Sequence, residues 1–300
     1  MTRSITTNTR PDASDVRDQP GTRAVAPSPL KYHVATRTVV GREGTPVTVK
    51  IETIGPVTGV PVTFLHGLVG LNDHWESVVA RISSTCRCTL LELPLLDLRG
   101  DDCSVDGAVD LTARFLETHG PSVLVGNSFG GHVAARIAIE RHDLVKGLVL
   151  TGASGMIEKT LMSDVQIRPS LEWLERKIGE LFFDKSKMNP MDITRAFEEL
   201  SHRDHARAMV RLSRTARKDH LGATAGNIVC PTLLVWGRED VVTPPEACEQ
   251  FHAKIPGSSV VWLDRCGHAP MIEHPDLFSD AMLRFVAGIN GINGINGITS

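Results

Sequence analysis

The sequence predicts an α/β fold with a mostly parallel central sheet, helices on both faces and an inserted helical cap. Three observations lead to this prediction. Short apolar segments alternate with amphipathic ones along most of the chain, as in repeated strand–helix units. Residues 122–135 read as a buried parallel strand, a glycine-rich turn and a helix. Between about residues 155 and 222 only helical patterns remain.

The composition is that of an ordinary globular protein, with 41% apolar residues, 22% charged residues and a net charge of −3 in 300 residues. No basic surface is expected, which argues against a nucleic-acid partner. The apolar runs end far short of the ~20 residues of a membrane helix, so no membrane partner is expected. The six scattered cysteines lack metal-ligand spacing, and neither a metal nor a cofactor is predicted. Without a secretory signal pattern, we expect reduced thiols and a cytoplasmic location.

In the first half of the chain, apolar patterns predict strands at residues 47–54, 60–65 and 89–93. A helix should reach residue 82, and a second should run from a Ser104 N-cap to residue 120.

The pattern Gly-x-Ser-x-Gly at residues 126–130 places Ser128 at the apex of the central turn. Its glycines remove side chains where the backbone must bend and where strand and helix approach each other. In this strand–turn–helix setting the pattern predicts a nucleophile elbow. The alternative is a serine in a glycine-rich turn without a chemical role.

After a strand at residues 148–151, helical patterns fill residues 170–183, 190–200 and 202–218. Because strands resume after residue 222, we interpret this segment as a cap over the strand ends, where open α/β sheets bind ligands. Trp173 is a candidate for its pocket wall. The alternative is that these helices extend the core.

Two later strands, at residues 232–236 and 260–263, are each followed by a polar loop, and helices are expected at residues 245–255 and 275–287. A serine hydroxyl needs a base, and the base needs an acid that orients it. The chain order Ser, acid, His assigns Asp240 and His268 to these roles. Glu239 and Asp264 are alternative acids.

An oxyanion formed at Ser128 requires two hydrogen-bond donors. The backbone N–H of Phe129, directly after the nucleophile, is the first candidate. The second comes from the loop that follows residue 65, where we assign the Leu68 N–H, with Val69 as the alternative.

The predicted domain organisation follows from these segments. Residues 1–30 form a disordered N-terminal tail, residues 31–154 and 223–287 the core, and residues 155–222 the cap. Residues 288–300, with their Gly-Ile-Asn repeat, form a low-complexity C-terminal tail.

Four motifs occur in order: Leu65-His66-Gly67, the elbow at residues 126–131, Trp236-Gly237-Arg238-Glu239-Asp240 and Cys266-Gly267-His268. With these motifs, residues 45–287 resemble the α/β-hydrolase superfamily, which implies the α/β-hydrolase fold. The chain looks most like the branch that contains meta-cleavage-product hydrolases and carboxylesterase-like enzymes. The meta-cleavage-product hydrolases break a carbon–carbon bond in diketo acids.

The resemblance also implies substrate-binding residues. It places Arg195, in the cap, against a substrate carboxylate or dienolate, which a guanidinium pairs with bidentately. Asn127, before the nucleophile, is a further substrate-binding candidate. The alternative for Arg195 is a solvated helix arginine. Ala269 departs from the meta-cleavage branch, which usually has tryptophan there, whereas esterase-like members accept this change.

The sequence therefore predicts a serine hydrolase that acts on a small, largely apolar carbonyl substrate, either a carboxylic ester or the C–C bond of a diketo acid. Two alternatives stay open: an acyltransferase with the same triad, and a non-catalytic binding protein of this fold. The expected partner is a small molecule, and a homodimer is compatible with the sequence.

Overall fold

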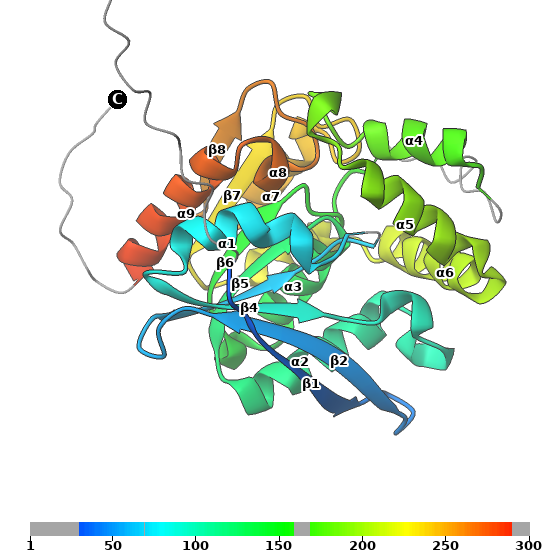
Figure 1. The fold of residues 1–300 in the computed structure, drawn as a ribbon. Coiled ribbons are helices and arrows are strands. Elements are labelled where there is room, and N and C mark those ends of the chain that lie inside the picture. Colours follow the sequence, from blue (N-terminus) through cyan, green and yellow to red (C-terminus); the bar gives the residue numbers. More distant parts are fainter. Residues whose placement is uncertain (1–29, 69, 159–168, 290–300) are drawn as a thin grey trace, which may run out of the picture. The chain divides into compact units, whose positions relative to one another are not determined.

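The computed structural model describes residues 30–68, 70–158 and 169–289, and the elements below belong to one unit, residues 31–300. These residues form an eight-stranded sheet in the order β1-β2-β4-β3-β5-β6-β7-β8 (Figure 1). Its strands are β1 (His33–Val40), β2 (Pro46–Ile54), β3 (Val60–Leu65), β4 (Cys86–Glu92), β5 (Ser122–Asn127), β6 (Val145–Thr151), β7 (Thr232–Gly237) and β8 (Ser259–Leu263). Only β2 is antiparallel to its neighbours β1 and β4, which confirms the mostly parallel sheet.

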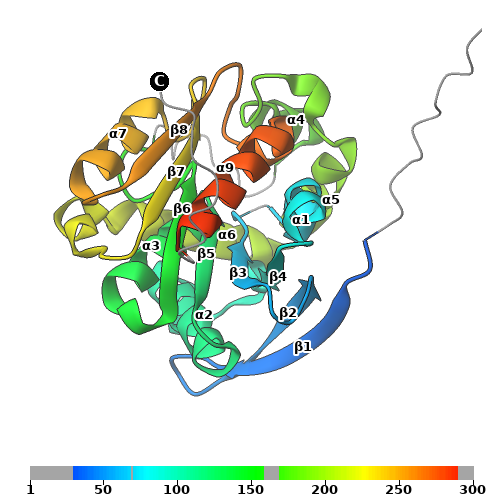
Figure 2. The same cartoon turned by 90° about the vertical axis from the view of Figure 1, so that its left-hand side faces the viewer.

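Helices cover both faces of this sheet. The α-helices are α1 (Glu76–Ile82), α2 (Val105–His119), α3 (Phe129–Glu140), α4 (Leu171–Gly179), α5 (Pro190–Ser201), α6 (Arg203–Lys218), α7 (Pro245–Lys254), α8 (Pro270–Glu273) and α9 (Pro275–Ile289). The short 3-10 helices are η1 (Asn72–Trp75), η2 (Leu95–Asp97), η3 (Gly100–Asp102), η4 (His142–Leu144), η6 (Lys185–Lys187), η7 (Leu221–Ala223) and η8 (Ala225–Asn227). Figure 2 shows α2, α3 and α7 on one face and α1 and α9 on the other. No helix formed by the described residues is long and apolar enough to cross a membrane.

Burial on both faces explains the apolar runs of the central strands. Val123, Leu124 and Val125 of β5 have no exposed surface. At the start of α1, the Trp75 ring packs against Phe278 of α9, with the ring centroids 5.9 Å apart. The aromatic packing between α1, α9 and the sheet continues the core on this face.

Most predicted elements are present, and the differences have local causes. The edge strand β1 was not predicted because its side chains are mostly exposed, with Val39 its one buried residue. α9 continues to Ile289, so residues 288–289 belong to a helix rather than to the predicted tail. Ser104 caps α2 as expected, because its Oγ accepts a hydrogen bond of 3.0 Å from the Gly107 N–H. The rest of both predicted tails lies outside the described residues.

The helical segment between β6 and β7 contains α4, α5 and α6, and the described residues there include no strand. Figure 1 shows these helices beyond one end of the sheet. The Val105 N–H of α2 donates to Thr215 Oγ1 of α6 at 3.1 Å. The Leu181 carbonyl, which follows α4, accepts a hydrogen bond of 2.8 Å from the His268 N–H. Backbone hydrogen bonds therefore join this insert directly to the core.

Candidate active site

Ser128 stands at a sharp turn between β5 and α3. Its φ of 54° lies in the left-handed region, which is uncommon for residues other than glycine. A Cβ on Gly126 would lie 2.4 Å from the Gly130 carbonyl oxygen, and one on Gly130 would lie 2.4 Å from the Leu65 carbonyl oxygen. Only glycine therefore fits at the two positions that flank the serine. The strained turn presents a half-buried Ser128 beyond the end of the sheet.

The loops after β7 and β8 bring Asp240 and His268 together. Asp240 Oδ2 lies 2.9 Å from His268 Nδ1, and both side chains are buried. The second carboxylate oxygen of Asp240 accepts backbone N–H bonds from Val242, at 2.8 Å, and Thr243, at 2.9 Å. The Thr243 hydroxyl donates to Asp240 Oδ2 at 2.9 Å. The carboxylate is thus held in one orientation, facing the imidazole.

The two alternative acids are occupied elsewhere. Glu239 accepts a hydrogen bond from the Cys266 N–H at 2.9 Å. Asp264 forms a surface ion pair of 2.8 Å with Arg238. Of the three acids, the structure therefore pairs Asp240 with the histidine.

The surroundings of His268 favour its protonated form. Burial disfavours the imidazolium, but the charge and hydrogen bond of Asp240, followed by the charge of Glu158, outweigh it and raise the pKa of His268 above its ordinary value. A buried histidine with a raised pKa and an oriented carboxylate partner has the properties of a general base.

Asn127 joins the elbow to the histidine loop. Its side-chain N–H₂ group donates to the Thr151 carbonyl and to the His268 carbonyl, each at 3.1 Å. Although Asn127 borders the cavity described below, both of its donors are directed at the backbone. These contacts favour a positioning role for Asn127 over the predicted role as a substrate ligand.

The two residues whose backbone N–H groups are predicted to stabilise the oxyanion lie near Ser128, one next to it in the chain and one in the loop after β3. Phe129 is the first residue of α3, where N–H groups have no partner within the helix, and its ring is buried in the core. Leu68 lines the cavity. A Cβ on Gly67 would lie 3.4 Å from Ser128 Cβ, so the Leu68 loop passes close to the serine. Val69, the alternative donor, lies outside the described residues.

A cavity of about 240 Å³ lies between the sheet end and the helical insert. Ser128 and His268 both line it. Its walls are mainly apolar and include Trp173, Leu174, Ile178, Phe182 and Met271. Such a cavity suits a small apolar ligand that presents one polar group to Ser128.

Arg195 is not among the residues that line this cavity. Its guanidinium forms ion pairs with Asp73, at 2.8 Å, and with Asp192, at 2.6 Å. Arg195 borders instead a neighbouring cavity of about 220 Å³ on the other side of Leu68. Because two protein carboxylates hold the guanidinium, these contacts do not favour the predicted clamp on a substrate carboxylate, which stays a prediction.

Glu158, which no motif in the sequence singled out, lines the cavity of Ser128. Burial raises the pKa of its carboxyl group above the ordinary value, and the nearby charges of His268 and Arg217 only partly oppose this. A usable signal was present in the sequence. Glu158 follows β6, and the loops after parallel strands meet at the sheet edge that carries Ser128.

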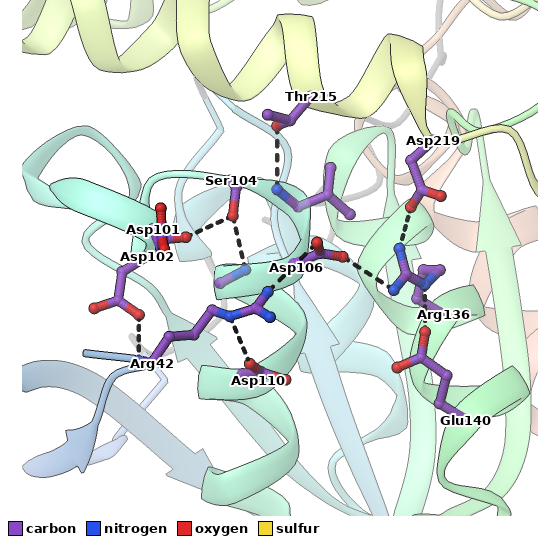
Figure 3. A network of polar contacts seen from close by, with 12 residues as sticks. Arg42, Asp101, Asp102, Ser104, Asp106, Asp110, Arg136, Glu140, Thr215 and Asp219 are labelled. Carbon is purple, nitrogen blue, oxygen red and sulfur yellow. Dashed lines mark hydrogen bonds and ion pairs between the residues drawn. The ribbon is translucent and has the colours of Figure 1, made fainter. Parts of the chain in front are cut away.

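A polar network connects the insert to the elbow. Asp219, just after α6, pairs with Arg136 of α3, which also contacts Asp106 at 3.0 Å (Figure 3). The buried His132 ring lies between Asp219, at 3.1 Å, and the Ser154 hydroxyl, at 3.2 Å. The Ser154 N–H in turn donates to the carbonyl of the elbow serine at 3.2 Å. The end of α6 is thus tied to the backbone of the nucleophile turn.

Among the described residues, no group of three or more His, Cys, Asp or Glu side chains is arranged to hold a metal ion. The six cysteines are unpaired.

A strained serine, a buried acid–histidine pair and a mostly parallel sheet define the hydrolase class of α/β proteins. Residues 64–281 match the sequence model of the Alpha/beta hydrolase family, so the chain belongs to this family. It is a hydrolase with an eight-stranded α/β-hydrolase fold.

Two kinds of enzyme are among its relatives. The chain is 32% identical over 254 residues to a 2-hydroxy-6-oxononadienedioate/2-hydroxy-6-oxononatrienedioate hydrolase of Klebsiella pneumoniae subsp. pneumoniae, covering 75% of this chain and 86% of the relative. It is 26% identical over 248 residues to a pimeloyl-[acyl-carrier protein] methyl ester esterase of Neisseria meningitidis, covering 76% and 77%.

The fold is similar to that of a meta-cleavage product hydrolase from Pseudomonas fluorescens IP01. The TM-score is 0.70 at 21% identity, over 86% of this chain and 98% of that chain. C–C bond hydrolases and esterases are therefore both among the proteins that this chain resembles.

Proposed function

We propose that the chain is a serine hydrolase with Ser128 as nucleophile, His268 as general base and Asp240 as the acid that orients it. The observation that carries this proposal is the buried Asp240–His268 pair, 2.9 Å apart, at the cavity that Ser128 also lines. Three side chains from loops after three strands meet at one sheet edge, as acyl-transfer chemistry requires.

The proposed reaction begins when His268 takes the proton of the Ser128 hydroxyl and the serine oxygen attacks the substrate carbonyl. The N–H groups of Phe129 and Leu68 stabilise the oxyanion. His268 then protonates the leaving group, which departs and leaves an acyl-enzyme. Water attacks this intermediate with the same base, and the acid is released.

The cavity favours a neutral carboxylic ester over a dicarboxylate. Its walls are mainly apolar, Arg195 is held by two carboxylates, and Glu158 adds a further acid. These features differ from what a dianionic substrate needs. We therefore place the chain with the esterases of its family, and we propose that α4–α6 act as a cap that closes the cavity.

The test compares wild type, Ser128→Ala and the exposed control Ser201→Ala on a short-chain p-nitrophenyl ester. We expect Ser128→Ala to lower kcat by about 10⁶-fold and Ser201→Ala to leave it unchanged. Wild type should also be labelled covalently by a fluorophosphonate, which separates an enzyme from a non-catalytic binding protein. Equal turnover by wild type and Ser128→Ala would refute the nucleophile.

A parallel assay decides between the two bond types. A vinylogous diketo acid from ring cleavage is offered under the same conditions, and its loss of absorbance is followed. We expect it to be cleaved far more slowly than the neutral ester. Adding a primary alcohol to the ester assay and searching for the transesterified product tests the acyltransferase alternative.

A further inference from the structure

The charged side chains that line the cavity of Ser128 differ in whether they form ion pairs or hydrogen bonds with other residues. Asp192 is already paired with Arg195, at 2.6 Å, and with His74, at 3.3 Å. Lys177 donates to Glu180 at 3.0 Å. Glu158, by contrast, lines the cavity, and no hydrogen bond or ion pair joins it to another residue in the described ranges. A carboxyl group in this position is available to a ligand.

Glu158 is also within electrostatic reach of the proposed base. Its charge contributes to the raised pKa of His268, and His268 in turn opposes the effect of burial on Glu158. The other charges that act on Glu158 come from Arg217 of α6 and His132 of α3. Since Glu158, Ser128 and His268 line one cavity of about 240 Å³, a ligand bound at Ser128 occupies the space that Glu158 also lines.

The apolar surroundings of the Glu158 carboxyl group allow it to discriminate between ligands of opposite charge. In a cavity with mainly apolar walls, charges interact more strongly than in water. A substrate carboxylate there would face Glu158 without help from Arg195, whose guanidinium is occupied by Asp73 and Asp192. A substrate ammonium group would instead form an ion pair with the Glu158 carboxylate.

We propose that Glu158 determines specificity, so that the site selects carbonyl substrates bearing an ammonium group near the reacting bond and discriminates against those bearing a carboxylate there. This inference rests on the proposed function of Ser128. It concerns the charge of the substrate rather than the chemistry of the triad.

The kinetic test uses three p-nitrophenyl esters of matched acyl length, whose chains end in a methyl, a trimethylammonium or a carboxylate group. Burial raises the pKa of Glu158, so the esters are compared at about pH 8, well above the ordinary carboxyl pKa of about 4.3. The variants are wild type, the isosteric Glu158→Gln, the charge-preserving Glu158→Asp and a matched control, Glu175→Gln, on the exposed surface of α4.

For wild type we expect kcat/KM to be highest for the ammonium ester and lowest for the carboxylate ester. Glu158→Gln removes one attraction and one repulsion, each of which we expect to change kcat/KM by about tenfold, the effect of ~1.4 kcal/mol. The ammonium-to-carboxylate ratio should therefore fall by about a hundredfold. The ratio is the readout because any general effect of the substitution on turnover acts on both esters alike. Glu158→Asp and Glu175→Gln should keep the wild-type order. A ratio that Glu158→Gln leaves within about twofold of wild type would overturn the proposal.

A binding measurement keeps this result separate from the proposed hydrolysis. Acetophenones with a para-trimethylammonium or para-carboxylate group cannot be hydrolysed, and calorimetry gives their affinities for each variant. We expect tighter binding of the cation by wild type and loss of this preference in Glu158→Gln. If esters are turned over but neither ratio depends on Glu158, the specificity inference fails alone. If the binding preference depends on Glu158 but no ester is hydrolysed, the proposed function fails alone.

Discussion

Replacing Asn127 by alanine tests whether the elbow and the histidine loop are held together by one side chain. The asparagine donates to the carbonyls of Thr151 and His268, each at 3.1 Å, and it is buried. Asn127→Ala removes two hydrogen bonds worth ~1 kcal/mol each and leaves two buried carbonyl groups without these donors. We therefore expect a loss of about 2–4 kcal/mol in the free energy of unfolding.

In a domain of this size, such a loss corresponds to a Tm lower by roughly 5–12 °C, measurable by calorimetry. Activity should fall more than binding, because the His268 backbone loses an anchor while the apolar cavity walls stay in place. We expect kcat for a p-nitrophenyl ester to fall by about 10²-fold with a small change in KM, since small misplacements of a catalytic group have effects of this size.

The matched control is Asn189→Ala, which removes the N-cap of α5, a hydrogen bond of 3.1 Å to the Met191 N–H. It should lower stability by about 1 kcal/mol and leave kcat unchanged, because Asn189 is exposed and is not among the residues that line the cavity of Ser128. If Asn127→Ala unfolded at the wild-type temperature, or kept wild-type kcat, the bracing role assigned to Asn127 would be incorrect.

Two further predictions concern the base and the turn. Only neutral His268 can accept the serine proton, so kcat/KM should rise with pH, with a midpoint above the ordinary value of ~6.5 because its pKa is raised. Asp240→Asn should move this midpoint to lower pH and reduce kcat by about 10⁴-fold, whereas an unmoved midpoint in a pH–rate profile would exclude Asp240 as the cause. Gly130→Ala places a Cβ 2.4 Å from the Leu65 carbonyl oxygen and should destabilise the fold by about 3 kcal/mol. In urea unfolding, the open position Gly288→Ala serves as its control, and equal midpoints for both variants would contradict the predicted clash.

The central strands and the elbow could be predicted because their signals are local. A strand buried on both faces is mainly apolar, as Val123, Leu124 and Val125 of β5 are, and a turn this tight admits only glycine two residues before and two residues after Ser128. The edge strand β1 has no such signal. It faces a partner on one side only, its side chains are mostly exposed, and its pairing with β2 follows from contacts that no local pattern records.

The choice among neighbouring acids could be made only in part from sequence. Chain order and the position after β7 brought both Glu239 and Asp240 into consideration, because loops after parallel strands meet at one edge. The loop conformation decides between them. The carboxylate of Asp240 receives the N–H groups of Val242 and Thr243 and faces the histidine, whereas Glu239 turns toward the Cys266 N–H.

The sequence by itself determined the fold class and the three side chains proposed for catalysis, because each is tied to a strand end by a short loop with recognisable chemistry. The tertiary structure alone decided which charges face the substrate. Arg195 matched a family pattern, yet its guanidinium is held by Asp73, 122 residues away in the chain. Glu158 matched no family pattern, yet it lines the cavity of Ser128. The direction of a long charged side chain depends on which distant carboxylates and apolar walls surround it, and packing brings those groups together only in the folded protein.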